Sequence, residues 1–166
     1  MALLALTMIA MQASYCQDGF QDRYVTVNGL RLHYLDWGSP RKPPFIMLHG
    51  ISRVAHQFDH LAQLFRKDYH VIAIDMRGHG DSAWSPEAAY LVEDYVKDLE
   101  SVVEQLNLRD VVLLGNSTGG RVVQVYAGLH PDRVARVDRG TGRSRACTGH
   151  GGEVRPARRQ GAGRCG

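Results

Sequence analysis

The stretch VVLLGNSTGGRVV, residues 111–123, decides the fold. It begins with an apolar run at 111–114 that is short and rich in β-branched residues, as is typical of a buried parallel strand. A glycine-rich turn follows at 115–120, and apolar residues then recur at helical spacing from Val122. A strand, a Gly-x-Ser-x-Gly motif and a helix in this order predict a sharp turn centred on Ser117.

This turn makes Ser117 a candidate nucleophile. A serine at such a position has a strained backbone, and Gly115, Gly119 and Gly120 allow the backbone on either side to approach closely. The hydroxyl then points outward at the start of the helix, and the N–H of Thr118 faces the position where an oxyanion forms. The alternative is an ordinary serine in a glycine-rich turn.

Length and composition are typical of one globular domain, with 166 residues and a hydrophobic fraction of 44%. The net charge of +3 is unevenly distributed. Residues 139–166 contain seven arginines and one acid, a net of +6, which leaves −3 for residues 1–138. The three cysteines lie far apart, so neither a disulfide framework nor a zinc ribbon is expected. Such cysteine usage predicts a cytoplasmic location. The cysteines are Cys16, Cys147 and Cys165.

Residues 1–22 are expected to form a flexible N-terminus. The apolar run at 1–13 contains no Lys or Arg, so the basic region of a secretory signal is missing. The run is also too short to span a bilayer, so no membrane association is expected. Export is the weaker alternative to a cytoplasmic location, and Met8 and Met11 are alternative start positions.

Predicted strands and helices alternate over residues 23–137. A β-hairpin at 23–37 turns at Asn28-Gly29, a strong signal for a two-residue turn. The alternation that follows predicts an α/β fold, with an open, mostly parallel sheet and helices on both faces. Its buried strands are expected at 45–48, 69–74 and 111–114, and its helices at 53–66, 91–106 and 118–130.

The apolar periodicity stops after residue 137. The next strand is expected to start at Val134, but the apolar pattern does not continue and the strand should not form. The sheet is therefore expected to end after about five strands, following the helix after Ser117 in the chain. Residues 138–166 are expected to be a Gly/Arg-rich tail, either disordered for lack of apolar surface or translated out of frame from GC-rich codons. Because the tail has no aromatic residues for base stacking, no nucleic-acid binding is expected.

Four motifs make the chain resemble the α/β-hydrolase superfamily over residues 23–137. Their order and spacing are typical of the members with a serine nucleophile. The resemblance implies an α/β-hydrolase fold with a catalytic triad in the order serine, acid, histidine, and with Ser117 as the nucleophile. The motifs are Leu48-His49-Gly50, DMRGHGDS at 75–82, the elbow around Ser117, and HPDRV at 130–134.

The resemblance also implies the surroundings of Ser117. An oxyanion hole would have two backbone N–H donors, from Thr118 and from Ile51, which follows His49-Gly50. His49 would shape its loop and would not be the base. The segment at 75–82 would be structural, and no metal or organic cofactor is implied.

The acid and the base of the triad are not found at their expected places. Only His130 and His150 follow Ser117. His130 should end the elbow helix away from the active-site edge, and His150 lies in the tail. Asp132 and Asp138 are both expected to be poorly placed to orient a base. We therefore expect the N-terminal half of a hydrolase, inactive by itself.

The expected parent activity is hydrolysis of a small-molecule ester or a related acyl bond, including carbon–carbon bonds, through an acyl-enzyme on Ser117. A serine argues against the dehalogenase and epoxide-hydrolase branches, which resemble this family but have an aspartate at that position. The competing interpretation is a non-catalytic remnant, a binding protein, or a subunit that needs a complementing partner.

Two further patterns carry less weight. Residues 78–83 contain a Gly-x-Gly-x-x-Ala pattern that is typical of dinucleotide binding, but a loop and not a helix is expected after it. His56 and His60 have the spacing of a zinc-binding pair, but Gln57 stands where metalloproteases with that spacing need a glutamate. Surface histidines are the simpler interpretation.

Overall fold

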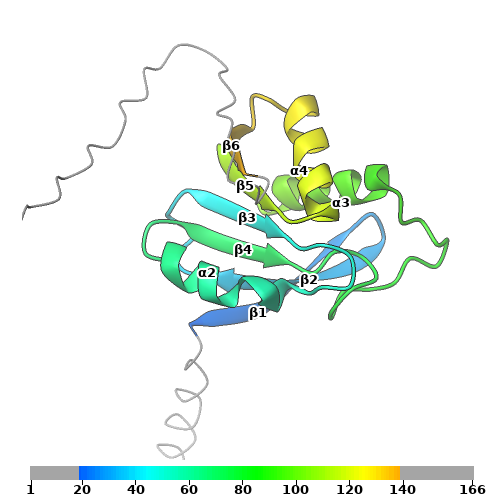
Figure 1. The fold of residues 1–166 in the computed structure, drawn as a ribbon, viewed down its shortest axis with the longest axis horizontal. Coiled ribbons are helices and arrows are strands. Elements are labelled where there is room, and N and C mark those ends of the chain that lie inside the picture. Colours follow the sequence, from blue (N-terminus) through cyan, green and yellow to red (C-terminus); the bar gives the residue numbers. More distant parts are fainter. Residues whose placement is uncertain (1–18, 139–166) are drawn as a thin grey trace, which may run out of the picture.

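Six strands form one sheet in residues 19–138, the part of the chain that the computed structural model describes (Figure 1). The strand order is β1-β2-β4-β3-β5-β6. The strands are β1 (Phe20–Val27), β2 (Leu30–Trp37), β3 (Pro44–Leu48), β4 (His70–Ile74), β5 (Val111–Gly115) and β6 (Val134–Asp138). The helices are the short 3-10 helix η1 (Ala55–Phe58) and the α-helices α2 (Asp59–Phe65), α3 (Val92–Gln105) and α4 (Thr118–Leu129).

The predicted hairpin is confirmed. β1 and β2 pair antiparallel, and both turn residues have a positive φ, 50° at Asn28 and 76° at Gly29, as a type I′ turn requires. β1 starts at Phe20, so residues 20–22 belong to a strand and not to the flexible segment predicted for 1–22. Residues 1–18, with Cys16, lie outside the described part.

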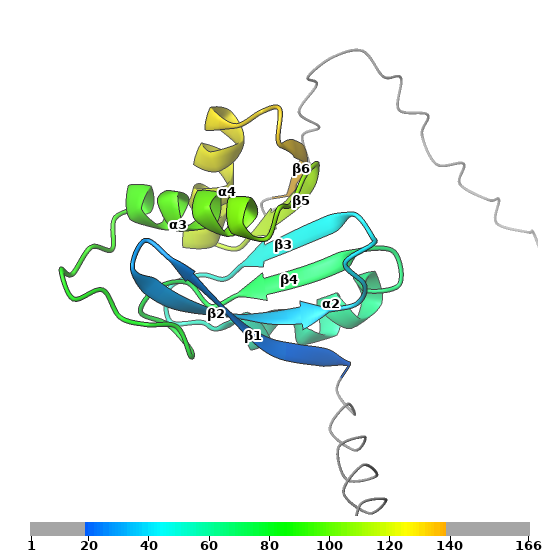
Figure 2. The ribbon, with the colours of Figure 1, turned by 180° about the vertical axis from the view of Figure 1, so that it is seen from behind.

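The sheet is parallel where strands and helices alternate. β3 pairs parallel with both β4 and β5, and β5 pairs parallel with β6, whereas β2 pairs antiparallel with β4. Helices α3 and α4 cover one face, and η1 with α2 covers the other (Figures 1 and 2). The predicted α/β fold with helices on both faces is therefore confirmed.

The predicted helix at 53–66 differs in detail. It is a turn of 3-10 helix followed by a short α-helix, so it is not continuous. Val54 and Leu64 have the apolar spacing of a helix face in the sequence but are exposed, whereas Ala55 and Ala62 are fully buried beside Phe58. This segment packs on the sheet through the small side chains of Ala55 and Ala62 as well as through Phe58, so large apolar residues alone do not mark its buried face.

The strand expected to be lost after α4 does form over its first five residues. β6 pairs with β5, and Val134 and Val137 are buried in the core that α4 covers. A register irregularity opposite Val111 and Val112 lets two valines three positions apart both point inward, which breaks the strict alternation expected of a strand. Asp138 therefore ends a strand and does not begin the tail, while residues 139–166 lie outside the described part.

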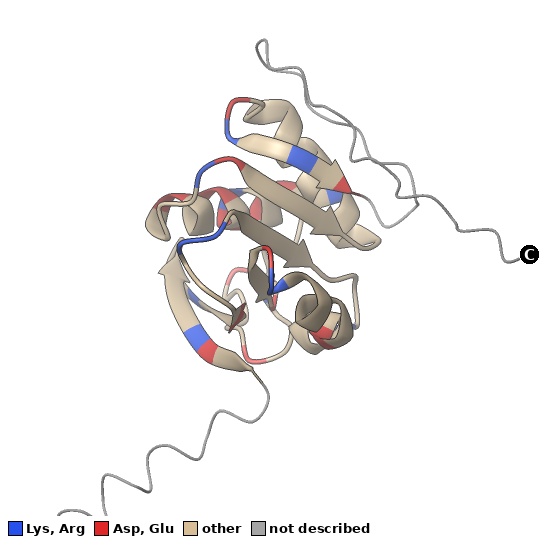
Figure 3. Cartoon of the chain, turned by 90° about the vertical axis from the view of Figure 1, so that its left-hand side faces the viewer, with Lys and Arg blue, Asp and Glu red and all other residues tan. Residues whose placement is uncertain are grey.

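Figure 3 marks charged residues of both signs along the ribbon, on the outer strands, the helices and the loops. Within residues 19–138, none of the helices combines the length and the apolar character that crossing a membrane demands.

Candidate active site

Ser117 lies at a sharp turn between the end of β5 and the start of α4. Its backbone has φ 50° and ψ −114°, a conformation that residues other than glycine rarely adopt. Ser117 is exposed and occupies the N-cap position of α4, yet its hydroxyl makes no capping hydrogen bond. A strained serine whose hydroxyl is not used by its own helix fits a nucleophile better than a capping residue.

The glycines around Ser117 are required by the close approach of backbone segments. A Cβ on Gly115 would lie 2.5 Å from the N of Gly120. A Cβ on Gly119 would lie 2.5 Å from the carbonyl oxygen of His49 and closer still to that of Leu48. The N–H of Gly119 donates to the same His49 oxygen at 3.1 Å, so the elbow sits directly on the end of β3.

The loop after β3 lies beside the nucleophile candidate. A Cβ on Gly50 would be 3.1 Å from the Cβ of Ser117, so the two residues are neighbours in space. Ile51 follows Gly50 and is 63% exposed. Of the predicted oxyanion donors, Thr118 follows Ser117 in the chain, and Ile51 follows the residue that lies beside Ser117 in space. That their N–H groups serve as donors stays a prediction.

His49 is held in place by both of its ring nitrogens. It is fully buried, with Nδ1 2.8 Å from the carbonyl oxygen of Gly50 and Nε2 accepting the N–H of Met76 at 3.0 Å. These partners require the neutral ring, with the proton on Nδ1. Burial lowers the pKa of His49, which also favours the neutral form. The geometry agrees with a loop-shaping role and leaves neither nitrogen for Ser117.

This environment predicts how stability depends on pH. Because the pKa of His49 is lowered from its ordinary value of 6.5 in the folded protein, the unfolded chain takes up the proton first as the pH falls. The stability that the neutral ring contributes is therefore present above about pH 6.5 and is lost below it. We expect the free energy of unfolding of the wild type to exceed that of His49→Gln more at pH 8 than at pH 5. A difference that grows on acidification would contradict this.

The segment 75–82 is structural, as the resemblance implies. Asp75 is buried, and its carboxylate accepts the N–H of Ala55 and lies 2.8 Å from Nδ1 of His33. The loop wraps around this carboxylate, since a Cβ on Gly80 would lie 2.6 Å from its Oδ1. The space that a dinucleotide phosphate would need beside Gly80 is thus occupied by an acid, and no helix follows the loop before α3.

His130 lies far from Ser117, as expected. It follows the last residue of α4, and at ~1.5 Å per residue this helix places it about 20 Å from Ser117 along the axis. Its Nε2 lies 3.2 Å from a carboxylate oxygen of Glu100 on α3. His150 lies outside the described residues.

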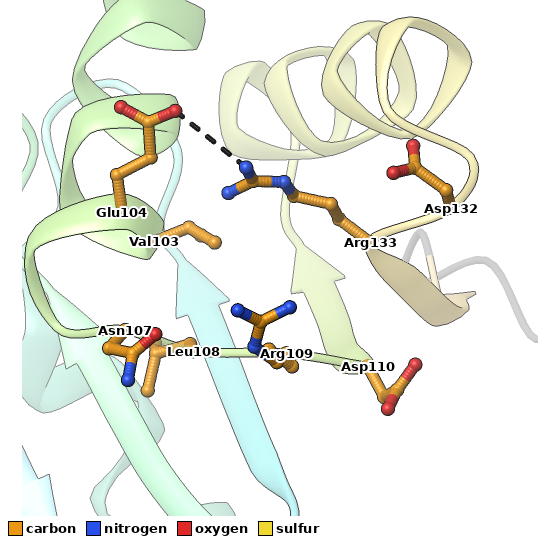
Figure 4. A pocket seen from close by; sticks show the side chains of 8 residues that line it. All are labelled: Val103, Glu104, Asn107, Leu108, Arg109, Asp110, Asp132 and Arg133. Atoms are coloured by element: carbon orange, nitrogen blue, oxygen red, sulfur yellow. Dashed lines mark ion pairs between the residues drawn. The ribbon is translucent and has the colours of Figure 1, made fainter.

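Asp132 and Asp138, both expected to be poorly placed to orient a base, lie at opposite ends of the strands β5 and β6. Asp138 pairs with Leu114 and ends β6 at the carboxyl edge, where Ser117 also lies. Asp132 borders a hollow of about 480 Å³ at the other edge, where β5 begins (Figure 4). There Arg133 lies 3.9 Å from Glu104.

The predicted zinc spacing does not produce a metal site. His56 belongs to η1 and His60 to α2, so the two residues are not one turn apart on a continuous helix. Nδ1 of His56 lies 2.9 Å from a carboxylate oxygen of Asp59. Within residues 19–138, no three His, Cys, Asp or Glu side chains form a group that could hold a metal ion.

A family model described as alpha/beta hydrolase fold matches residues 43–137, more than half of the chain. The chain belongs to the alpha/beta hydrolase fold family. It is 40% identical over 116 residues to a non-heme haloperoxidase of Rhodococcus erythropolis, covering 68% of this chain and 41% of that protein. It is 34% identical over 109 residues to a 3-hydroxybutyrate-oligomer hydrolase of Cupriavidus necator, covering 64% of this chain and 37% of that protein.

Solved structures of alpha/beta hydrolases have the same fold. The crystal structure of epoxide hydrolase A from Mycobacterium thermoresistibile superimposes with a TM-score of 0.67 at 33% identity, covering 71% of this chain and 38% of that one. This alpha/beta hydrolase chain thus spans about two fifths of the length of these three relatives.

Proposed function

We propose that this alpha/beta hydrolase cleaves ester or related acyl bonds with Ser117 as its nucleophile. The observation that carries the proposal is the strained, exposed Ser117, whose hydroxyl does not cap α4 and whose neighbour across the site is Gly50. Such a position leaves the hydroxyl open to a substrate carbonyl and places backbone N–H groups beside it.

The reaction divides into two half-reactions. The Oγ of Ser117 attacks the carbonyl carbon and loses its proton to a base, and the carbonyl oxygen becomes an oxyanion that accepts hydrogen bonds from the N–H groups of Ile51 and Thr118. Collapse expels the alcohol with a proton and leaves an acyl-enzyme, which water then hydrolyses to the acid. We assign the base and its orienting acid to no residue among 19–138.

The identity of residue 117 separates two kinds of relative. The structural relative from M. thermoresistibile is named an epoxide hydrolase. By the family resemblance, the epoxide-hydrolase branch is expected to have an aspartate where this chain has Ser117. A serine forms an acyl-enzyme from an ester. The name of the 3-hydroxybutyrate-oligomer hydrolase indicates hydrolysis of an oligomer of a hydroxy acid, which supports a small-molecule ester as the substrate here.

Replacing Ser117 by alanine tests the proposal. We expect Ser117→Ala to abolish covalent labelling by a fluorophosphonate, a reduction of about 10³-fold or more, because the labelled oxygen is removed. Mass spectrometry of the labelled peptide measures this directly. Ser101→Ala on α3 is the matched control and should label as the wild type does, since Ser101 bonds only to Asn28 at the surface.

Labelling that survives in Ser117→Ala would show that another residue is the nucleophile. A folded wild type that is never labelled would favour the competing interpretation, a non-catalytic remnant or binding protein. A subunit that needs a complementing partner would gain labelling only when the missing base is supplied by that partner.

A further inference from the structure

The buried carboxylate of Asp75 connects three segments that lie apart in the sequence. Asp75 follows β4 and is 2% exposed. Its Oδ1 accepts the N–H of Ala55 at 2.6 Å. Its Oδ2 lies 2.8 Å from Nδ1 of His33 on β2 and accepts the N–H of Asp81 at 3.2 Å. One side chain therefore joins the loop after β3, the strand β2 and the loop after β4.

The contact with Ala55 is short and charge-assisted. Ala55 is fully buried and begins η1, where a backbone N–H has no partner within its own helix. Without Asp75 this N–H would be buried and unpaired, whereas a carboxylate acceptor gives one of the stronger hydrogen bonds in proteins. The far end of the loop after β3 thus depends on Asp75.

The near end of the same loop, at His49, is fixed by Met76, the residue that follows Asp75. The N–H of Met76 donates to Nε2 of His49, whose Nδ1 lies 2.8 Å from the carbonyl oxygen of Gly50. Residues 49 and 55 are therefore both anchored to the consecutive residues Asp75 and Met76. The loop is held at its two ends by one short segment.

Between the anchors the loop has little packing of its own. Ile51 and Val54 are exposed apolar residues, and Ser52 has a φ of 60°. The N–H of Arg53 donates to the carbonyl oxygen of Gly50 at 3.2 Å, and Gly50 lies against Asn116 and Ser117. Together with these contacts, the two anchors set where the N–H of Ile51 lies relative to Ser117. A displacement of about 1 Å at such a group is enough to cost a large part of its effect on a reaction.

We propose that Asp75 is a positioning residue, which fixes the loop from Gly50 to Ala55 so that the N–H of Ile51 faces the oxygen of a substrate bound at Ser117. The role in the reaction rests on the proposed function. His33 holds Asp75 in turn, since its other ring nitrogen, Nε2, lies 3.1 Å from Asp22 on β1. Asp75 itself touches neither Ser117 nor a substrate, so it acts through Ile51.

The test compares Asp75→Asn with the wild type in the full chain, by NMR hydrogen exchange and by the kinetics of fluorophosphonate labelling. Asparagine keeps the size and one oxygen but removes the charge. We expect exchange at Ala55, and at Arg53, whose N–H donates to the carbonyl oxygen of Gly50 in the same loop, to become about tenfold faster. The maximal labelling rate constant at Ser117 should fall about tenfold, while the half-saturating concentration stays within about twofold. Asp68→Asn, at an exposed site before β4, is the matched control and should change none of these quantities.

The possible results separate this proposal from the assignment of Ser117. Unchanged exchange at Ala55 and Arg53 in Asp75→Asn, or a maximal labelling rate in Asp75→Asn equal to that of a labelled wild type, would overturn the positioning role. A wild type that is not labelled would count against Ser117 as a nucleophile in this chain by itself, and the exchange at Ala55 and Arg53 would still decide whether Asp75 anchors the loop.

A milder variant covers the case in which Asp75→Asn does not fold. Asp22→Asn changes a side chain that is 60% exposed and removes only the outer support of His33. We expect exchange at Ala55 and Arg53 to become about two- to threefold faster, with the amides of the elbow unchanged. No acceleration in this folded variant would contradict the proposal.

Discussion

Gly119→Ala is expected to destabilise the protein by about 3 kcal/mol or more and to abolish labelling of Ser117. The added Cβ would lie 2.5 Å from the carbonyl oxygen of His49 and closer still to that of Leu48. Both are backbone atoms at the end of β3, which is hydrogen-bonded to β4 on one side and to β5 on the other. Relief of the clash would need the elbow to move away from the sheet, which would displace Ser117.

The same substitution elsewhere on α4 should have the opposite effect. A Cβ on Gly128 would meet no atom within 4 Å, so Gly128→Ala is expected to stabilise the protein by about 0.5–1 kcal/mol through helix propensity. Urea unfolding measures both variants, and labelling measures the site. A Gly119→Ala variant with the stability of the wild type would show that the elbow is not packed on β3 in this way.

Asp98→Ala is expected to cost about 3–5 kcal/mol in the free energy of unfolding. Asp98 on α3 accepts two hydrogen bonds of 2.6 Å from the guanidinium of Arg77, and the two side chains are only 6% and 7% exposed. The hydrogen bonds to Asp98 raise the pKa of Arg77, so the guanidinium stays charged at every accessible pH. Alanine would leave this charge buried without its partner and would also remove an acceptor of Asn28.

Two variants separate the burial of the charge from the loss of packing. Glu104 lies on α3, as Asp98 does, and is an exposed partner of Arg133. Glu104→Ala should lower the free energy of unfolding by less than about 1 kcal/mol. Combining Asp98→Leu with Arg77→Met removes both charges and should recover much of the loss. Equal losses in Asp98→Ala and in the double variant would assign the effect to packing, measured by urea unfolding in each case.

Features with a local signal could be predicted from the sequence. Asn28-Gly29 fixes its turn because both residues adopt a positive φ, and the glycines around Ser117 mark a close approach that few other residues allow. The short apolar runs that became β3, β4 and β5 are bounded by Gly, Pro and Asp. Each of these signals lies within a few residues of the structure it determines.

Features that depend on partners distant in the sequence could not be predicted. The burial of Ala55 and the extent of β6 follow from packing on strands that periodicity alone does not reveal. At the candidate site, the sequence indicated Ser117 and a structural role for the loop at 75–82. It did not indicate that Asp75 reaches Ala55, because the carboxylate and the N–H are brought together only by the pairing of β3 with β4.

The order of the strands has a consequence for the route by which the chain folds. The hairpin of β1 and β2 needs only a two-residue turn and can form within microseconds. Its open edge, however, pairs with β4 and not with β3, which comes next in the chain. β3 is completed on both sides only when β5 arrives, more than sixty residues after β3 ends. We therefore expect the hairpin to form early and the elbow that carries Ser117 to be acquired late, in the step that closes the centre of the sheet.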